Sequence, residues 1–243
     1  MKNLLLHFVV LCFGVLTLTG ISSCQQDEVD GISKTDTVGW RTNQNSFMYP
    51  PSTHPFGNSF EAWGEDYWNA AYALDCEQAF SPQIVELTDN VITFISVLGD
   101  DEVDFTLSRH QALFLPLATT LFAYPCPDAE YEPAPDQTLE EFLQEGAGDV
   151  IDLVEVVGLT FDGNEVENLD DYRFLSDLFY FTGNPEQAEC YDPCITGEPQ
   201  PGVFDGYMVM FKKMSVGEHT IVMHGEMPEY ELNWNVTLNI TVE

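Results

Sequence analysis

Residues 61–72 carry the side chains whose types and spacing come closest to the acid and base of an enzyme. Glu61 and Glu65 stand four residues apart, which places both carboxylates on one face of a helix. Two carboxyl groups that flank a glycosidic bond can hydrolyse it. That chemistry also needs a cleft and one carboxyl group with a raised pKa. Because the chain has 41 acidic residues, many such pairs arise without a function, and a hydrolase is an alternative here rather than the leading hypothesis.

The same stretch is rich in aromatic side chains that could bind a glycan. Trp63, Trp68 and Tyr72, together with Glu65, could form a surface on which a sugar ring stacks. The competing interpretation is packing, because a stripe of apolar residues at helical spacing would bury the helix against a sheet: Phe60, Trp63, Tyr67, Ala70 and Leu74. Exposure of the three rings would favour glycan binding, and full burial would remove them as contacts.

Two groups of residues offer atoms that metal ions prefer, but neither has a regular metal-binding spacing. A run of carboxylates suits calcium and lacks the spacing of an EF-hand loop: Asp100, Asp101, Glu102 and Asp104. We expect an exposed acidic turn there, with calcium binding as the alternative. His219 and His224 stand five residues apart in a predicted strand, so they should point to opposite faces.

The formal net charge of −34 limits the partners of the chain. Nucleic-acid binding depends largely on Lys and Arg side chains that neutralise phosphates, and the chain has seven of these against 41 acids. Docking of the folded domain on an anionic membrane surface is disfavoured for the same reason. The sequence therefore predicts no nucleic-acid partner, and it contains no motif for an organic cofactor.

The first 24 residues determine the predicted location. Lys2 precedes an apolar run over residues 4–18, and small residues follow, which is the pattern of a secretory signal. The run is too short for a typical membrane-spanning helix. The ending Ile21-Ser22-Ser23-Cys24 resembles a bacterial lipoprotein signal, in which the chain is cut before the cysteine and the cysteine is acylated. The resemblance implies a signal peptide over residues 1–23 and a lipid on Cys24; a plain signal peptide is the alternative.

Residues 24–53 are predicted to be a flexible acidic and polar tether. The acidic residues after Cys24 resemble the tether that directs Bacteroidota-type lipoproteins to the outer face of the outer membrane. The implied location is the bacterial outer membrane, with the domain lipid-anchored and facing the cell surface. The periplasmic face of the same membrane is the alternative.

Four cysteines remain in the exported part of the chain: Cys76, Cys126, Cys190 and Cys194. An even number of cysteines in an exported chain predicts two disulfides, and four cysteines allow three pairings. We favour Cys190 with Cys194, which closes a small loop, and Cys76 with Cys126. A zinc site is the alternative, which the scattered spacing disfavours.

Hydrophobic periodicity predicts a mostly β domain with two helices. The helices are expected over 59–74, capped by Asn58, and over 138–153, where Thr138 and Glu141 form a capping box. Strands are expected over 91–98 and 103–107 as a hairpin, 112–117, 156–161 and 164–166 as a hairpin, 178–181, 206–214, 219–225 and 232–242. Residues 182–202 are predicted to be a long loop.

Three segments resemble an uncharacterised family of exported bacterial proteins. They are His54-Pro55-Phe56-Gly57-Asn58-Ser59 with Trp63 and Trp68; Leu159-Thr160-Phe161-Asp162-Gly163 with Asn168-Leu169-Asp170-Asp171-Tyr172-Arg173; and Asp205-Gly206-Tyr207 with Gly217-Glu218-His219-Thr220-Ile221. The resemblance implies no activity and no catalytic residues. The last of these segments also resembles the late strands of immunoglobulin-like sandwiches.

The sequence as a whole predicts a single domain over residues 54–243. Its expected fold is a mostly antiparallel β-sandwich, immunoglobulin-like or jelly-roll-like, with two peripheral helices. The leading hypothesis is a lipid-anchored, non-enzymatic protein of the cell envelope that binds a glycan or another envelope protein. A secreted hydrolase with paired carboxylates and a structural component of a surface assembly are the alternatives.

Overall fold

Two mixed β-sheets form the framework of the chain that the computed structural model describes, which is residues 46–96 and 99–243. Sheet A runs in the order β1 (Gln83–Thr88), β2 (Val91–Ile95), β4 (Ala112–Ala123), β9 (Gln200–Phe211) and β7 (Arg173–Leu175), and β8 (Phe179–Phe181) also pairs with β9. Sheet B runs in the order β3 (Asp100–Leu107), β11 (Leu232–Val242), β10 (Gly217–Met227), β5 (Val156–Phe161) and β6 (Asn164–Glu165). The predicted mostly β class is confirmed, and the arrangement is consistent with a β-sandwich. Two pairings are parallel, β2 with β4 and β3 with β11, so the sheets are mixed rather than wholly antiparallel.

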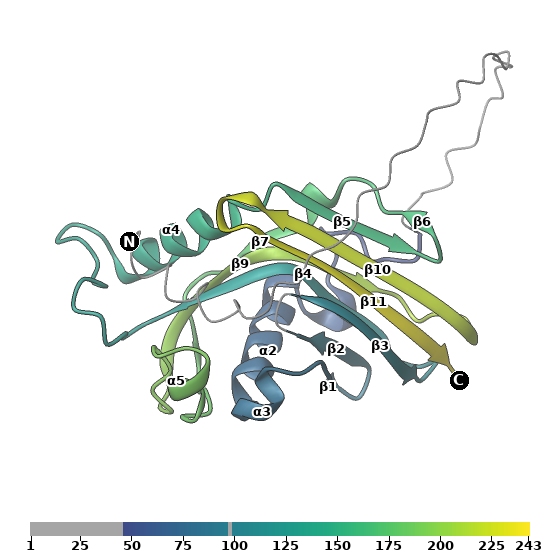
Figure 1. Cartoon of the computed structure of the whole chain (residues 1–243), viewed down its shortest axis with the longest axis horizontal. Helices are drawn as coiled ribbons and strands as arrows, with labels where there is room; N and C mark the ends of the chain where they lie inside the picture. Colours follow the sequence, from purple (N-terminus) through teal and green to yellow (C-terminus); the bar gives the residue numbers. More distant parts are fainter. Residues whose placement is uncertain (1–45, 97–98) are drawn as a thin grey trace, which may run out of the picture. The chain divides into compact units, whose positions relative to one another are not determined.

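Sheet A lies between two layers (Figure 1). Residues that pair across β4 and β9 point to the same side of the sheet, and successive residues alternate between its faces. On one face, Phe114 contacts the ring of Tyr67 in helix α2 (Phe60–Ala73), at 6.5 Å between ring centroids. On the other face, the ring of Phe211 lies 5.4 Å from the ring of Phe161 in sheet B. Sheet A is therefore covered on both faces, which explains why almost every residue of β4 and β9 is buried.

The two long predicted helices are present and begin at capped residues. Ser59, rather than the expected Asn58, caps α2 by accepting a hydrogen bond from the backbone of Ala62 at 3.2 Å. Helix α4 (Leu139–Ile151) opens with the predicted capping box, in which Thr138 and Glu141 exchange hydrogen bonds. Shorter helices, α3 (Cys76–Ala79) and α5 (Gln187–Cys190), were not predicted.

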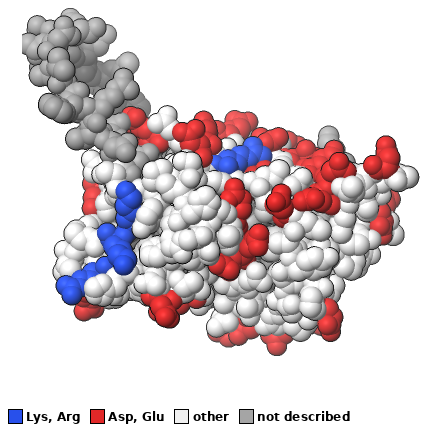
Figure 2. Space-filling model, turned by 180° about the vertical axis from the view of Figure 1, so that it is seen from behind, with Lys and Arg blue, Asp and Glu red and all other residues white. Residues whose placement is uncertain are grey.

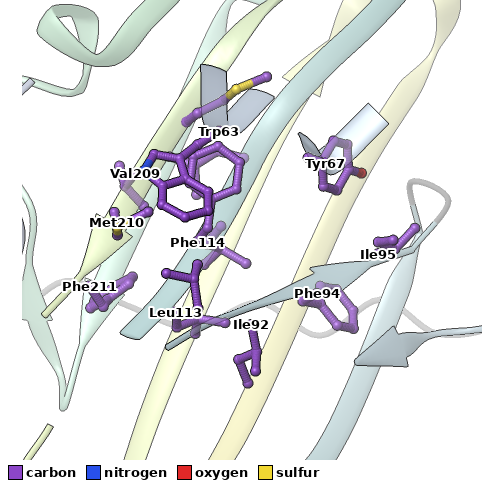
Figure 3. Close-up of a cluster of buried hydrophobic side chains, with 14 of the residues drawn as sticks. Trp63, Tyr67, Ile92, Phe94, Ile95, Leu113, Phe114, Val209, Met210 and Phe211 are labelled. Atoms are coloured by element: carbon purple, nitrogen blue, oxygen red, sulfur yellow. The ribbon is translucent and has the colours of Figure 1, made fainter. Parts of the chain in front are cut away.

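The core gathers at the centre of sheet A, where α2 packs on β4 and β9 (Figure 3). Trp63 and Tyr67 reach down from the helix toward Phe114, and the strands of sheet A add apolar side chains on both of its faces: Ile92, Phe94, Ile95, Leu113, Val209, Met210 and Phe211. In β11 the predicted alternation is confirmed, with its apolar members buried: Trp234, Val236, Leu238, Ile240 and Val242. The hairpin of β5 and β6 is also confirmed, because Asp162 and Gly163 both have the positive φ that its two-residue turn requires.

Both disulfides form, but with a pairing that differs from the favoured one. Cys76 bonds to Cys190 and Cys126 bonds to Cys194, so each disulfide joins the 182–202 loop to a distant part of the chain. Cys190 lies at the end of the short helix α5, and its partner Cys76 opens helix α3. A small closed loop between Cys190 and Cys194 was the wrong expectation, because local spacing does not show which segments the fold brings together.

The expected hairpin of residues 91–98 and 103–107 is also wrong. Strand β2 belongs to sheet A, whereas β3 crosses to sheet B and pairs in parallel with β11, from Asn235 with Asp100 to Val242 with Leu107. The acidic residues 100–104 therefore lie within a strand and not in a turn. The sequences of the two strands do not distinguish these outcomes, because the partner of β3 is β11, which is far away in the chain.

The tether was predicted to extend too far along the chain. Residues 46–53 are described, and they pack on the domain rather than linking it: Met48 is buried and pairs with Phe211, and the backbone of Tyr49 donates to Met210. The described residues, 46–96 and 99–243, group as one compact unit. The signal peptide, Cys24 and the rest of the predicted tether lie outside the described residues.

Two helical glycines should respond in opposite ways to substitution by alanine. A Cβ on Gly64 would lie 2.2 Å from Cζ of Phe204, whose side chain is fully buried, whereas a Cβ on Gly148 would meet only the Asp205 carboxylate, at 3.8 Å. Overpacking a core lowers the free energy of unfolding by about 1–3 kcal/mol. The higher helix propensity of alanine relative to glycine raises it by about 1 kcal/mol. We expect Gly64→Ala to lower the free energy of unfolding by about 1–2 kcal/mol. Gly148→Ala should raise it by about 0.5–1 kcal/mol. Urea unfolding of both variants measures this, and equal effects would contradict the packing of α2 on β9.

Candidate functional site

The aromatic residues predicted to contact a glycan are buried. The exposed fractions are 1% for Trp63, 6% for Trp68 and 3% for Tyr72. Trp63 donates its indole N–H to the carbonyl of Pro55 at 3.1 Å, and Trp68 stacks on Tyr72 with ring centroids 5.5 Å apart. These rings belong to the core, so the packing interpretation is confirmed and the three rings are removed as glycan contacts.

Tyr72 is covered by the 182–202 loop, which explains why a second aromatic face of α2 is buried. Its hydroxyl donates to the buried carboxylate of Asp192 at 2.8 Å, and Gln187 donates to the last carbonyls of α2, Ala71 and Leu74. Burial raises the pKa of Asp192, although hydrogen bonds from Cys194 and Tyr72 oppose that shift. The two disulfides hold this loop in place over the end of the helix.

The paired carboxylates of the hydrolase hypothesis lie on the outer face of α2. Glu61 and Glu65 are both partly buried there. Partial burial raises the pKa of Glu65, and the negative charges of Asp66, Asp177 and Glu61 raise it further. A raised pKa is one requirement of a general acid, but neither glutamate lines the cavity described below. Partial burial, together with the neighbouring negative charges, explains the raised pKa of Glu65 without any catalytic role.

The acidic run for which calcium binding was the alternative does not form a cage in strand β3. Glu102 and Asp104 point from β3 toward Asn239, whose side-chain amide donates to both carboxylates, at 3.1 and 2.9 Å. Asp101 accepts a hydrogen bond from Ser96. Within residues 46–96 and 99–243, no group of three or more His, Cys, Asp or Glu side chains has an arrangement that could hold a metal ion.

A small cavity lies beside the turn of residues 212–216, which joins β9 to β10. Its volume is about 190 Å³. Its apolar lining comes from Phe47, Phe161 and Met214. Its polar lining comes from Lys212, Lys213, Ser215 and His219. The cavity therefore joins an apolar floor to a rim that carries positive charge.

The two lysines of this rim have no acidic partner among the described residues. There, ion pairs form between Arg173 and two aspartates, Asp152 and Asp205, and between His219 and Asp162. Lys212 donates to the backbone carbonyl of Ser46 at 2.8 Å and lies 5.7 Å from the ring centre of Tyr49. Lys213 is exposed, and its ammonium lies 6.0 Å from the ring centre of Phe56.

Exposed apolar side chains flank the lysines. Phe56 is 43% exposed and sits in a turn with a positive φ of 56°, and Val216 is 64% exposed at the tip of the 212–216 turn. Phe56 also contacts Tyr49 and Trp63 edge-on, which fixes its ring beside Lys213. Apolar and cationic groups therefore stand side by side on an accessible surface.

The turn between β3 and β4, residues 108–111, lies at the same end of the domain. Leu113 in β4 pairs with Phe211 in β9, so the residues just before β4 and just after β9 leave the sheet together. This second turn contributes Arg109. We call the 212–216 and 108–111 turns the basic end. Figure 2 shows acidic side chains spread over the visible face, with Lys and Arg gathered in a row toward one end and in one separate cluster.

His219 links three segments at the basic end. Its Nδ1 lies 2.8 Å from Oδ2 of Asp162, and its Nε2 lies 3.2 Å from Oγ and 2.9 Å from the carbonyl oxygen of Ser215. Its ring stacks on Phe161 at 5.4 Å, and 11% of its side chain is exposed. Asp162 also accepts from the backbone N–H of Thr220. The imidazole therefore holds the 212–216 turn against the hairpin of β5 and β6.

The order Ser215, His219, Asp162 matches that of a catalytic triad, but the hydrogen bonding does not. A triad needs an unprotonated Nε2 that accepts the serine proton. Here Nε2 lies closer to the Ser215 carbonyl oxygen, which can only accept a hydrogen bond, so Nε2 must donate. With Nδ1 facing a carboxylate, both ring nitrogens act as donors, which is the state of the imidazolium ion. At pH values where the imidazole is protonated, the group is a charged clamp on the turn, and its hydrogen bonding differs from that of a triad.

His224 does not join His219 in a metal site. It lies on the opposite, exposed face of β10, where its ring covers Gly158 of the neighbouring strand. The opposite orientation predicted from their spacing is confirmed.

Sequence reasoning missed the basic end. The signal was present in the scarcity of cations, because Lys212 and Lys213 are adjacent in a chain with only seven Lys and Arg. Residues 46–49, Phe56 and Phe161 are distant in sequence, so their meeting at these lysines could not be seen. In the described part of the chain, no helix is both long and apolar enough to cross a membrane.

Comparison with known proteins gives no family. No protein-family model matches the sequence, and no curated protein matches it. One solved structure, titled "Structure of PbICP-C in complex with falcipain-2", matches at a TM-score of 0.25 and 9% identity, over 63% of this chain and 99% of that chain. At this identity and TM-score, the likeness transfers neither a fold nor a partner to this protein.

The clamp at His219 makes the stability of the turn depend on pH. Burial alone would lower the pKa of His219, but its hydrogen bonds to Asp162 and to the Ser215 carbonyl outweigh burial and raise the pKa above its ordinary value of 6.5. Because the folded pKa is the higher one, the stabilisation is complete below pH 6.5 and is lost as the pH rises through the folded value. NMR titration should give a pKa above 6.5 in the native protein and a lower one in Asp162→Asn. An unchanged pKa in this variant would contradict the clamp.

Proposed function

We propose that this chain is a non-enzymatic protein-binding module of the bacterial cell envelope, held at the outer membrane by a lipid on Cys24. The observation that carries the binding proposal is the basic end. There, two lysines without acidic partners among the described residues stand beside exposed apolar side chains and a cavity. The support for the lipid anchor is the sequence over residues 4–24 alone.

The charge of the domain makes this surface selective. A net charge of −34 repels anionic partners from most of the molecule, so an acidic partner is attracted at the basic end and disfavoured elsewhere. Apolar side chains that are rimmed by charge are typical of protein-binding surfaces. The residues that suggested glycan binding are not accessible to a glycan, because the rings of Trp63, Trp68 and Tyr72 are buried.

The anchor is tested by the mass of the mature N-terminus. We expect protein purified from its bacterial membrane to begin at Cys24 and to carry acyl chains, because the 21–24 motif resembles a lipoprotein signal. Cys24→Ser should remain uncut and unacylated. A mature chain that begins at another residue without a lipid would contradict the anchor and leave the binding proposal standing.

The binding surface is tested by photo-cross-linking in living cells. A photoreactive residue in place of Val216 should give one discrete protein adduct, because this side chain is exposed between the lysines and His219. The matched control replaces Glu229, which is exposed in the connection at the other end of β10, and should not give that adduct.

Addition of Lys213→Glu should abolish the Val216 adduct, and Lys213→Arg should keep it, because the first reverses the charge and the second retains it. The same adduct at both positions, or one that is indifferent to the charge of residue 213, would contradict binding at the basic end. An adduct removed by glycosidases rather than proteases would assign the surface to a glycan.

A further inference from the structure

We infer that the cavity at the basic end receives the C-terminal residue of a polypeptide, with its free carboxylate at Lys212 and Lys213 and its apolar side chain on the cavity floor. The inference rests on the proposed function and adds which part of the partner is bound. The occupant is defined by its chemistry: one terminal carboxylate and one apolar side chain on the same residue.

The floor of the cavity suits an apolar side chain. The ring of Phe47 lies 4.7 Å from that of Phe161, and these two rings form the aromatic floor. Phe47 also packs on Phe211, which is fully buried, at 5.8 Å between ring centroids. Met214 is buried and completes the lining, and its flexible thioether adapts to the shape of a bound group. Phe47 and Phe161 are each only partly buried, so a ligand can still cover them.

The rim suits a carboxylate. An ammonium group has three N–H donors, and Lys212 uses one on the Ser46 carbonyl, so donors remain on both lysines. Hydrogen bonds from an ammonium to a carboxylate are charge-assisted and stronger than neutral ones. His219 also lines the cavity, but its ring nitrogens are occupied by Asp162 and Ser215, so it makes no direct contact with the carboxylate.

The charged groups around His219 determine how far its imidazolium ion contributes to the attraction of an anion. Asp162 lies against Nδ1, Glu218 is the preceding residue, and Lys212 and Lys213 share its cavity. The carboxylate of Asp162 balances the imidazolium ion. The net attraction for an anion therefore comes chiefly from the two lysines.

The size of the cavity favours a terminal residue over a whole small molecule. Pockets that enclose drug-sized ligands measure about 300–1,000 Å³. This cavity, at about 190 Å³, holds one side chain and its adjoining carboxylate. In a C-terminal residue both groups leave the same Cα, so a single residue covers the floor and reaches the rim. An internal Asp or Glu brings only the carboxylate and leaves the aromatic floor uncovered.

The experiment compares N-acetyl-phenylalanine with N-acetyl-phenylalaninamide, which share the ring and differ in the carboxylate. Amide chemical shifts of the purified protein are followed by NMR during titration with each compound. We expect the acid to shift the signals of residues 212–216 and His219 in a saturable manner. The amide should bind at least about tenfold more weakly, because it lacks the charge-assisted bonds.

Variants at one exposed position provide the controls. Lys213→Glu should weaken binding of the acid at least about tenfold, and Lys213→Arg should keep it within a few-fold, because Lys213 is exposed and neither change disturbs the core. Equal binding of the acid and the amide, or shifts that map elsewhere, would overturn the inference.

The failure of this inference differs from the failure of the proposed function. If the Val216 adduct forms and depends on the charge of residue 213, while neither acetylated compound binds at residues 212–216, the basic end binds a protein by another part of its chain. If the adduct is absent as well, the proposed function fails with the inference.

Discussion

Cations are scarce in this protein, and the structure depends on where each of them lies. The chain has seven Lys and Arg against 41 Asp and Glu, and four of the seven are in the described residues: Arg109, Arg173, Lys212 and Lys213. Arg173 meets the carboxylate of Asp205 with two of its nitrogens, at 3.0 Å from Nε and 2.6 Å from Nη2, and reaches Asp152 at 2.7 Å. Asp205 is 2% exposed, and a buried carboxylate without a partner is strongly destabilising. Arg173 is therefore needed by the buried carboxylate of Asp205. The other three cations lie at the basic end.

Strand β9 connects the ion pair of Arg173 with the two lysines of the basic end. It carries Asp205 beneath Arg173, it holds Phe204 under the helix glycine Gly64, and it ends at Phe211, where the two lysines follow. Because β9 pairs with β4, β7 and β8, the position of the 212–216 turn is determined by a strand that is paired on both of its edges in sheet A. His219 then holds the turn from the side of sheet B through Asp162. The basic end is thus supported by both sheets.

Sequence reasoning succeeded where the determining interactions are local. The alternation of β11, the turn at Asp162 and Gly163, and the capping box of α4 all depend on residues close in the chain, and all are confirmed. It failed where distant segments decide. The cysteine pairing, the crossing of β3 to sheet B and the cover that the 182–202 loop places over Tyr72 depend on contacts between segments far apart.

The candidate site also combines features that are visible locally in the sequence with contacts between distant segments. The adjacent lysines and His219 were visible in the sequence, but their meaning depends on Phe47, Phe56 and Phe161, which three other segments bring to them. The acidic and aromatic residues of α2 attracted attention because their spacing is regular. The regular spacing of the aromatic residues reflects packing, because Trp63 and Tyr67 of α2 belong to the core between the helix and sheet A.

The central claim is that the basic end is the surface of this acidic domain that attracts anions. Paramagnetic broadening of backbone amide signals by an anionic nitroxide, compared with a cationic one of the same size, tests it directly. We expect the anionic probe to broaden residues 212–216 most strongly, and the cationic probe to spare them and to broaden the acidic surfaces instead. Equal broadening of the 212–216 turn by both probes, or a maximum for the anionic probe on another surface, would show that the basic end does not attract anions.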